Sequence, residues 1–343
     1  MERIGVIFGG KSGEHEVSLL SATSVIEAID REKYDVVMIG ITKKGQWKLY
    51  GGDVKNLADG SWEETAKDIE ASDLKQLADF ALPILHGPYG EDGTIQGLFE
   101  MLDVPYAGCG VLSSALCMDK VSAKKIFERM GLPTARYKLV YAEDVREDMD
   151  SVIKEVEAEL PYTLFVKPSN MGSSVGISKV RNREELREAL TLAGKYDRRI
   201  IVEEGINCRE VETGVLGNHK PEVAAVGEIV AKLDFYDYTA KYTDDAGTEL
   251  SIPAKLPSST YEEIRGLAKK AYMALDCSGF ARIDFFVDKD TGEVYINEIN
   301  TIPGFTKYSM FPLMWKEAGL SFRELVERIV DLGYERYHAK NNR

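Results

Sequence analysis

The sequence predicts an α/β protein made of two or three packed units. In the first third of the chain, short apolar segments rich in β-branched residues alternate with helical patterns. This order is typical of a parallel sheet with crossover helices. A second stretch has the mixed order of a small α+β unit, and the last third is rich in strands. A length of 343 residues also favours several units over one.

The first unit is expected to hold the parallel sheet. Its helix places apolar side chains on one face, and the polar stretch before residue 73 is interpreted as surface. The expected elements are strand 4–8, helix 18–29, strand 36–41, a hairpin addition at 45–50, and strand 80–85, which ends at His86.

A second unit is expected to begin after Gly108. Asp119 is a favourable N-cap for a helix that runs to Met130, because Gly131 and Pro133 then terminate it. The elements expected after this helix are strand 137–141, helix 145–159, strand 163–167, a Gly/Ser loop at 169–176, strand 177–180, helix 183–193 and strand 200–203.

The third unit begins near residue 204 and carries a polar segment rich in Tyr and Asp at 234–248. The last residues, from Tyr337, are expected to fray. The elements expected in this unit are helix 261–275, strands 280–287 and 293–300, and an amphipathic helix at 321–332.

Composition excludes several classes of protein. The net charge of −14, from 57 acidic and 43 basic residues, argues against bulk nucleic-acid binding, which needs many cations. No segment is long and apolar enough for a signal peptide or a membrane span, so we expect a cytoplasmic protein without a membrane partner. The cysteines are scattered and show no metal-ligand spacing, so we interpret them as small buried apolar residues. They are Cys109, Cys117, Cys208 and Cys277.

Residues 5–12 read GVIFGGKS and fit the letter pattern of a Walker A loop. A true loop of this kind follows its strand, whereas here the apolar residues between the glycines are the strand itself. We therefore interpret 9–10 as a turn at the carboxyl edge of the sheet, where ligand loops collect. Glu14 and Glu16 lie at this turn. Glu16 fits equally well as an exposed acid in a first helical turn.

The two strands near the C-terminus carry the strongest chemical signal. A hairpin centred near Thr291 places Asp284 opposite Glu298 and Arg282 opposite Asn300 on one face, because side chains alternate along a strand. Facing carboxylates repel each other, and burying them costs several kcal/mol each unless a cation lies between them. Their oxygens suit Mg²⁺ shared with phosphates. The alternative is a solvated face with a salt bridge through Arg282.

Two further segments suggest a site for phosphates and a lid. Lys167 ends an apolar strand, and the glycine-rich loop after it could approach an anion closely; Lys120 adds a second cation. Segment 235–242 has four aromatic residues and one lysine, which favours a lid that excludes water. An edge strand packed on the core is the alternative. His86 stands at the ligand-facing edge of the first unit, either as a site residue or as an ordinary capped histidine.

Several motifs occur together in one order. They are FGG at 8–10, EHEVS at 14–18, LHG at 85–87, GEDGTIQG at 90–97, MDK at 118–120, KP at 167–168, GSSVG at 172–176, YTAKY at 238–242, RID at 282–284 and NEINTIPGFT at 297–306. Through them, the sequence resembles D-alanine–D-alanine ligases over nearly the whole chain.

The resemblance implies an ATP-grasp fold with a Rossmann-like N-terminal domain. The implied domains are an N-terminal substrate-binding α/β domain at 1–108, a central ATP-grasp subdomain at 109–203, and a C-terminal ATP-grasp subdomain at 204–343. The last would carry the lid, at about 234–250, and the metal site. The implied partners are two D-alanine molecules and ATP, and homodimers are common in the family.

For the nucleotide, the resemblance implies that Lys120 and Lys167 contact phosphates, that Glu203 and Ile206 hold adenine, and that Glu210 binds the ribose. It further assigns to this site Ser173, Ser174, Glu204, Lys241, Asn297 and Glu298. Two Mg²⁺ or Mn²⁺ ions would be held by Asp284, Glu298 and Asn300. The first D-alanine would become an acyl phosphate that the amine of the second then attacks.

For the amino acids, the resemblance implies that Glu14 holds the first ammonium group, linked to Ser173 and Tyr242, with His86 nearby. Ser309 and Lys241 would receive the second carboxylate. Arg282 and the backbone near Gly304 would stabilise the oxyanion.

This sequence departs from the family pattern at two positions. A lysine common after the hinge glutamate is replaced by Glu204, and a histidine common before Ser309 is replaced by Tyr308. The alternative substrates are D-serine or D-lactate in place of the second D-alanine, and Tyr242 favours D-alanine over D-lactate. Another carboxylate–amine ligase and a non-catalytic nucleotide-binding module are the remaining alternatives.

Overall fold

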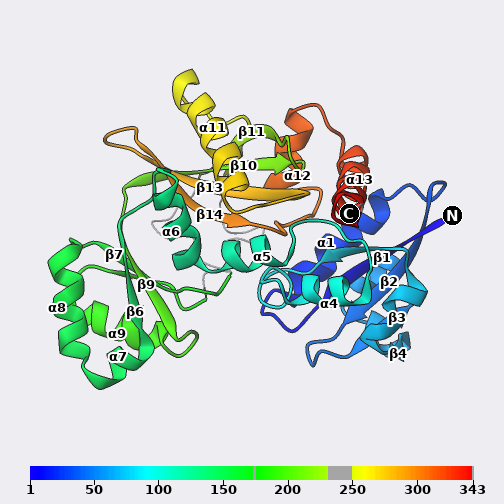
Figure 1. The fold of residues 1–343 in the computed structure, drawn as a ribbon, viewed down its shortest axis with the longest axis horizontal. Helices are drawn as coiled ribbons and strands as arrows, with labels where there is room; N and C mark the ends of the chain where they lie inside the picture. The colour runs from blue at the N-terminus through cyan, green and yellow to red at the C-terminus, as the bar shows by residue number, and fades with distance from the viewer. Residues whose placement is uncertain (173–174, 231–248, 342–343) are drawn as a thin grey trace.

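The computed structural model describes residues 1–172, 175–230 and 249–341. Its three sheets form three lobes: the N-terminal sheet, a central sheet, and a third sheet formed by the strands after residue 207 (Figure 1). Helices α5 and α6 lie where the lobes meet (Figure 1). No helix in the described ranges has both the length and the apolar composition needed to cross a bilayer.

The N-terminal sheet has the order β4-β3-β2-β1-β5, with β1 parallel to both β2 and β5. The predicted parallel sheet and the hairpin addition are therefore confirmed, since β3 pairs antiparallel with β2. Helix α1 (His15–Ala28) begins three residues earlier than predicted. The strands are β1 (Glu2–Gly9), β2 (Tyr34–Ile41), β3 (Trp47–Tyr50), β4 (Lys67–Ile69) and β5 (Phe80–Ile84).

The prediction that the polar stretch before residue 73 is surface was wrong in part. Trp62 is fully buried and its ring meets Phe8 edge-on at 5.1 Å between centroids. Leu57 is buried in the same core, so isolated apolar residues in a polar segment still anchor it. The short elements here are η1 (Val54–Leu57), α2 (Trp62–Thr65), η2 (Ala71–Asp73) and α3 (Leu74–Leu77).

The central sheet is antiparallel, in the order β6-β9-β7-β8. The single helix predicted at 145–159 is instead two, because Asp148 ends the first and caps the second by accepting from Ser151 N at 3.0 Å. The elements are β6 (Tyr137–Tyr141), α7 (Ala142–Glu147), α8 (Met149–Glu159), β7 (Leu164–Pro168), β8 (Ser178–Val180), α9 (Arg183–Ala193) and β9 (Arg199–Glu204).

The third sheet is antiparallel, in the order β12-β11-β10-β13-β14. Helix α11 packs on one face, where Tyr272 joins the core with Ile283. Helix α12 packs on the other face, where Gly214 lets Trp315 approach the backbone closely. The elements are β10 (Cys208–Leu216), β11 (Glu222–Val230), β12 (Glu249–Ser251), α11 (Ser258–Ala274), β13 (Phe280–Asp288), β14 (Val294–Asn300) and α12 (Met310–Glu317).

Helices α4 (Thr94–Leu102), α5 (Val111–Met118) and α6 (Lys120–Arg129) connect the first two lobes. Asp119 caps α6 as predicted, accepting from Ser122 N at 2.8 Å. Buried residues of α5 and α6, among them Cys117 and Phe127, share an apolar core with the third sheet. Helices α5 and α6 are thus packed against the third sheet.

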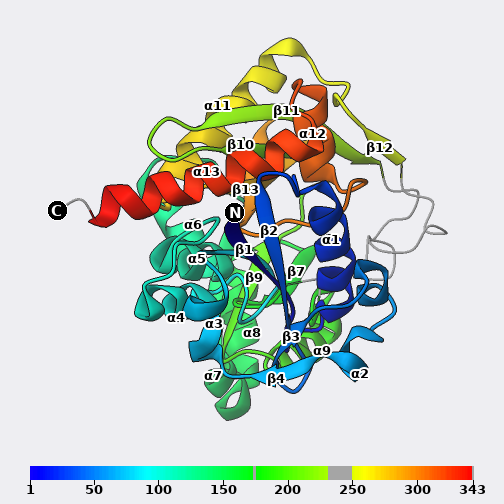
Figure 2. The ribbon, with the colours of Figure 1, turned by 90° about the vertical axis from the view of Figure 1, so that its right-hand side faces the viewer.

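The last helix, α13 (Phe322–Asn341), lies across the N-terminal lobe (Figure 2). The predicted fraying from Tyr337 was wrong. Tyr337 Oη donates to Asp103 at 2.8 Å, and Lys340 forms an ion pair with Glu100 of α4. These polar contacts to a neighbouring element extend the helix beyond its apolar stripe, which the helix pattern alone does not reveal.

Candidate active site

The β13–β14 hairpin contains the pairs predicted for the site, although the pairing nearer its turn is shifted by one residue. Asp284 lies opposite Glu298 and Arg282 opposite Asn300, and an irregularity follows because Phe285 pairs with Ile296. Asn297 therefore lies at a bulge. The four polar side chains are partly exposed, whereas the intervening apolar ones are buried, so the predicted division of faces is confirmed.

Charge on this face is organised around Arg282. Its Nε and Nη2 atoms donate to the two oxygens of Asp284, both at 2.7 Å, and Nε lies 2.9 Å from Glu212 Oε2 on β10. Burial opposes this positive charge, but the charges of Asp284 and Glu212 outweigh it and hold the pKa of Arg282 well above its ordinary value. Asn300 Nδ2 also donates to Asp284 at 2.9 Å. Arg282 is a fixed cation at the centre of this face.

Lys120 joins the central region to the hairpin. Its Nζ atom lies 3.3 Å from Glu298 Oε2 and donates to Met171 O in the glycine-rich loop at 2.9 Å. Asp284, Glu298 and Asn300 offer only oxygen donors among their possible metal ligands, the set that Mg²⁺ prefers. Cationic groups already contact both carboxylates. The residues on this face therefore fit a hard divalent cation by their chemistry.

A buried ion cluster lies at the ends of β7 and β9. Glu203 Oε2 meets Lys167 Nζ at 2.5 Å, and Oε1 meets Lys124 Nζ at 2.7 Å. Burial would raise the pKa of Glu203, but the two lysines outweigh it and lower that pKa to about 2. Burial lowers the pKa of Lys167, but the charges of Glu203, Glu298 and Glu210 outweigh it, and that pKa is raised. Lys167 therefore contacts Glu203 directly and also experiences the charge of Glu298 on the hairpin.

Lys124 was missed by the sequence analysis. It stands four residues after Lys120 on α6, so the two share one side of the helix, and this spacing is the signal that could have identified it.

Glu14 is a residue that the N-terminal lobe contributes to the candidate site. Its side chain is buried, and a methyl group at either Gly87 or Gly172 would press against its Oε2 atom. Both glycines therefore allow close approach, and the glycine-rich loop reaches this carboxylate. Glu16, in contrast, is exposed and pairs with Lys43, so its interpretation as an exposed acid in the first helical turn is confirmed.

His86 is buried, and both of its ring nitrogens have partners. Nδ1 lies 2.8 Å from Ile302 O, and Nε2 lies 3.0 Å from Ser21 Oγ. Because a carbonyl only accepts, Nδ1 carries the proton and Nε2 accepts from the serine hydroxyl. Burial lowers the pKa of His86, which agrees with a neutral ring. His86 thus holds the backbone after β14 instead of acting as a free base.

Glu91 is a second residue that the sequence analysis missed. Its two oxygens accept from Gly87 N and Ile302 N, each at 2.8 Å. Burial and the nearby charge of Glu14 raise the pKa of Glu91 to about 8. Phe305 N also donates to Ser21 Oγ at 3.3 Å. Ser21, His86 and Glu91, named here the interlobe clamp, therefore fix residues 302–305 against the N-terminal lobe.

Two family profiles match the chain. The D-ala D-ala ligase N-terminus profile covers residues 3–109, and the D-ala D-ala ligase C-terminus profile covers residues 126–331. The chain belongs to the D-alanine–D-alanine ligase family. A relative named D-alanine–D-alanine ligase, from Thermoanaerobacter sp. (strain X514), is 51% identical over 99% of this chain and 98% of its own length.

Two solved structures share the fold. The VanG D-Ala:D-Ser ligase from Enterococcus faecalis has a TM-score of 0.87 and 40% identity, covering 97% of this chain and 99% of that one. The D-alanine-D-alanine ligase from Coxiella burnetii has a TM-score of 0.86 and 33% identity, covering 99% and 96%. The ATP-grasp fold implied by the resemblance is therefore confirmed.

Other positions that the resemblance assigns to the site lie on or near β9 and β10, or outside the described residues. Ile206 lies in the segment between β9 and β10, and Glu210 is exposed on β10. Glu204 turns to Arg136, whose Nε donates to it at 2.8 Å, so the glutamate that replaces the family's common lysine has its own partner. Ser173, Ser174, Lys241 and Tyr242 lie outside the described residues, as does segment 234–248 of the expected lid.

The segment that precedes α12 carries the positions expected for the second amino acid. Ser309 Oγ accepts from Thr306 N at 3.1 Å and lies 2.8 Å from Thr306 Oγ1. Tyr308, the other departure from the family pattern, is 71% exposed. A methyl group at Gly304 would meet Ser309 Oγ at 3.3 Å, so these two predicted residues are close together.

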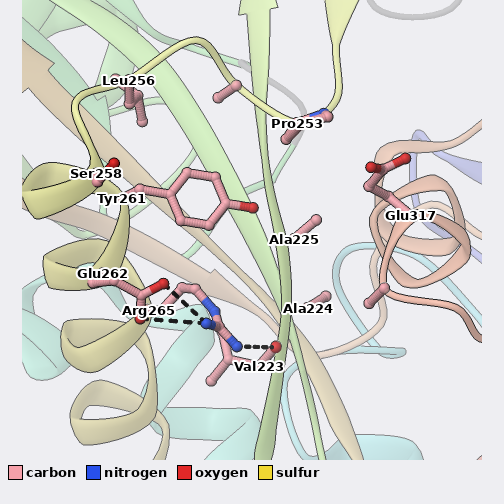
Figure 3. A pocket seen from close by; sticks show the side chains of 12 residues that line it. Val223, Ala224, Ala225, Pro253, Leu256, Ser258, Tyr261, Glu262, Arg265 and Glu317 are labelled. Carbon is pink, nitrogen blue, oxygen red and sulfur yellow. Dashed lines mark hydrogen bonds and ion pairs between the residues drawn. The ribbon is translucent and has the colours of Figure 1, made fainter.

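A groove of about 550 Å³ lies at the open edge of the third sheet. Figure 3 shows Tyr261 and Arg265 of α11 facing β11, where Arg265 Nη2 donates to Val223 O at 3.1 Å. None of the residues predicted for the active site lines it. The candidate active site is thus the charged layer between the lobes, not this groove.

Proposed function

We propose that this protein joins two D-alanine molecules in an ATP-dependent reaction through an acyl phosphate. One observation carries the proposal: the Arg282–Asp284–Glu298–Asn300 face of the hairpin contacts Lys120, and the charge of Glu298 acts on the buried Lys167. This arrangement supports the proposal, because oxygen ligands for a metal ion and cations for phosphates are what transfer of a phosphoryl group requires. Kinship over the full chain to proteins named for this reaction supports it.

The nucleotide would lie between the central and third sheets. Lys120 and Lys167 would contact its phosphates, Glu203 and Ile206 its adenine, and Glu210 its ribose. Because the side chain of Glu204 is held by Arg136, its contribution to adenine would come from its backbone. The other residues proposed for this site are Ser173, Ser174, Lys241, Asn297 and Glu298.

Asp284, Glu298 and Asn300 would hold two Mg²⁺ or Mn²⁺ ions. Such ions, when bound, neutralise charge on the phosphoryl group that moves. A chelator should therefore stop phosphate release, and added Mg²⁺ or Mn²⁺ should restore it.

The first D-alanine would place its ammonium group against Glu14, which is buried beside two glycines. A carboxylate oxygen would attack the γ-phosphorus of ATP and release ADP, leaving an acyl phosphate. The amine of the second D-alanine would then attack the carbonyl carbon and lose a proton, and phosphate would leave with that carboxylate oxygen. Arg282 and the Gly304 N–H would stabilise the oxyanion of this second step.

The second D-alanine would place its carboxylate near Ser309 and Lys241, with Tyr242 in the lid. D-serine at this position is the alternative, since a D-Ala:D-Ser ligase structure is 40% identical to this chain. The curated relative at 51% identity is a D-alanine–D-alanine ligase, which favours D-alanine. A homodimer and domain boundaries near residues 108 and 203 complete the proposal, and light scattering would measure the first of these.

Phosphate release with a panel of amino acids tests the function. The purified protein receives ATP and Mg²⁺ with D-alanine, D-serine, D-lactate or L-alanine, alone and in pairs with D-alanine. We expect release to depend on D-alanine and to be greatest with D-alanine alone. Faster release when D-serine or D-lactate is added would transfer the proposal to that substrate. No release with any D-amino acid would overturn it.

A further inference from the structure

The side chain of Lys124 is almost completely removed from solvent. Its side chain is 2% exposed, and of the described lysines only Lys124 and Lys167 are buried. A buried ammonium group is costly unless it is paired and fully hydrogen-bonded. Three neighbouring groups pair with the Lys124 ammonium group, and together they fix its position.

The partners of Lys124 use all of its donors. Its Nζ atom meets Glu203 Oε1 at 2.7 Å, Thr134 Oγ1 at 2.6 Å and Ala135 O at 3.3 Å. The same atom lies 5.5 Å from the centre of the Tyr137 ring, within the range of a cation–π interaction. An ammonium group has three N–H donors, so none is left for a phosphate. Lys124 therefore cannot act as a further phosphate ligand without losing a partner.

Lys167 stands in a different situation, although it contacts the same carboxylate. Its Nζ atom meets Glu203 Oε2 at 2.5 Å, and the charges of Glu298 and Glu210 act on it from the third sheet. If Lys167 turns to the phosphates, Glu203 loses one of its two cations. A buried carboxylate left without a partner costs several kcal/mol, so the second cation decides whether the change is tolerable.

We propose that Lys124 is a positioning residue that keeps Glu203 charged and fixed, which releases Lys167 to the phosphates and frees Glu203 Oε2 for the adenine amine. The inference rests on the proposed function for the identity of the nucleotide. In this inference Lys124 contacts no substrate itself, but it determines the positions of Lys167 and Glu203, which contact the nucleotide. Lys124 thereby sets both the affinity for ATP and the preference for a base that carries an amine.

The test is equilibrium binding of ATP and of inosine triphosphate, which carries a carbonyl oxygen in place of the adenine amine. Lys124→Gln should weaken ATP binding by about tenfold or more, the range expected for a lost charged hydrogen bond. The ratio of ATP to inosine triphosphate affinity should fall toward one. A purely structural role would lower thermal stability but leave this ratio unchanged. Lys125→Gln is the matched control, because Lys125 is the exposed neighbour on the same helix.

A double-mutant cycle with Glu203→Gln keeps the test valid even if Lys124→Gln alone fails to fold. With the carboxylate already neutral, adding Lys124→Gln should change ATP affinity by less than about twofold, because Lys124 acts through Glu203. A loss as large in this background as expected for the single variant would overturn the inference. So would an ATP preference in Lys124→Gln equal to that of the unaltered protein.

These outcomes can be separated from failure of the proposed function. Nucleotide binding needs neither D-alanine nor turnover. A protein that binds ATP but ligates no amino acid would refute the proposed function and leave the cycle interpretable. Independent effects of the two substitutions would refute the inference while ligation persists. Failure of the unaltered protein to bind ATP would overturn both.

Discussion

The candidate site has a proposed nucleotide end and a proposed amino-acid end, and these two ends hold buried carboxylates in opposite ways. At the nucleotide end, Glu203 lies between Lys124 and Lys167, and its pKa is lowered to about 2. At the amino-acid end, Glu14 and Glu91 lie close together, and within the described ranges neither forms a salt bridge with a lysine or arginine. The first end is neutralised by the protein itself, whereas an incoming ammonium group would neutralise the second.

This difference has opposite consequences for the pH dependence of folding. The depressed pKa of Glu203 contributes stability that is present above about pH 4.5 and is lost as the pH falls toward 2. The raised pKa of Glu91 contributes stability that is fully present below about pH 4.5 and is lost as the pH rises toward 8. The nucleotide end is therefore the acid-sensitive one, and the amino-acid end is sensitive to alkali.

The largest effect is expected where the two ends meet, at Glu298. Glu298→Gln should lower turnover by about 10²–10³-fold, because it removes a proposed carboxylate ligand of the metal ion that would neutralise the phosphoryl group. Steady-state phosphate release measures this. Glu293→Gln is the control, since Glu293 belongs to the same hairpin but is exposed at its turn. Near-normal turnover in Glu298→Gln would remove the metal assignment.

A smaller effect should separate the two ends directly. Glu14→Gln should raise the KM for D-alanine by roughly 10–100-fold, the range for a lost charged hydrogen bond, while ATP binding stays unchanged. Steady-state kinetics with varied D-alanine measure the KM, and nucleotide titration measures ATP binding. Glu16→Gln provides the control, because Glu16 lies near Glu14 in the sequence but is exposed and forms an ion pair with Lys43. Equal losses of D-alanine and ATP affinity would contradict the division between the ends.

The raised pKa of Glu91 predicts a measurable slope. Between about pH 4.5 and 8 the folded protein retains a proton that the unfolded chain has lost, so the free energy of unfolding should fall by up to about 1.4 kcal/mol per pH unit. Glu91→Gln should remove this slope, because glutamine does not titrate. Urea unfolding at pH 6 and pH 8 measures it. An unchanged slope would show that Glu91 is ionised in the folded protein.

The smallest effect is expected at the edge of the interlobe clamp. Ser21→Ala should lower the free energy of unfolding by about 1 kcal/mol, since it removes the hydroxyl that meets His86 and Phe305 N. It should raise the KM for D-alanine a few-fold, because residues 302–305 lose one of their supports. Ser24→Ala is the control, as the Ser24 hydroxyl donates only within its own helix, to Leu20 O. Equal effects of the two substitutions would argue against the clamp.

The hairpin shows what sequence reasoning captures well. The predicted pairs Asp284–Glu298 and Arg282–Asn300 are confirmed, but a symmetric turn at Thr291 would pair Phe285 with Asn297, whereas Phe285 pairs with Ile296. The bulge at Asn297 has a signal in the sequence, because the two polar residues Asn297 and Glu298 break the alternation of β14, and a symmetric pairing about the turn does not use it. Lys120 and Lys167 were also selected from the sequence as candidate phosphate-binding cations, because Lys120 follows a helix cap and Lys167 ends an apolar strand.

The residues that were missed owe their roles to contacts between distant segments. Lys124 belongs to an ordinary helix, and only the approach of β9 makes it a partner of Glu203. Glu91 is part of a quoted motif, yet its bond to Ile302 N spans 211 residues of sequence. Likewise, α13 continues through Tyr337 because Asp103 lies within reach. Local patterns do not encode such pairs, because folding brings them together.

Both ends of the site would act on one molecule of D-alanine, held by Glu14 and phosphorylated on its carboxylate. D-alanine labelled with ¹⁸O in the carboxylate tests this most directly, with mass spectrometry of the phosphate released alongside the dipeptide. We expect one ¹⁸O atom in each phosphate, because the amine displaces phosphate together with one oxygen of the labelled carboxylate. Unlabelled phosphate, formed while the dipeptide accumulates, would contradict it.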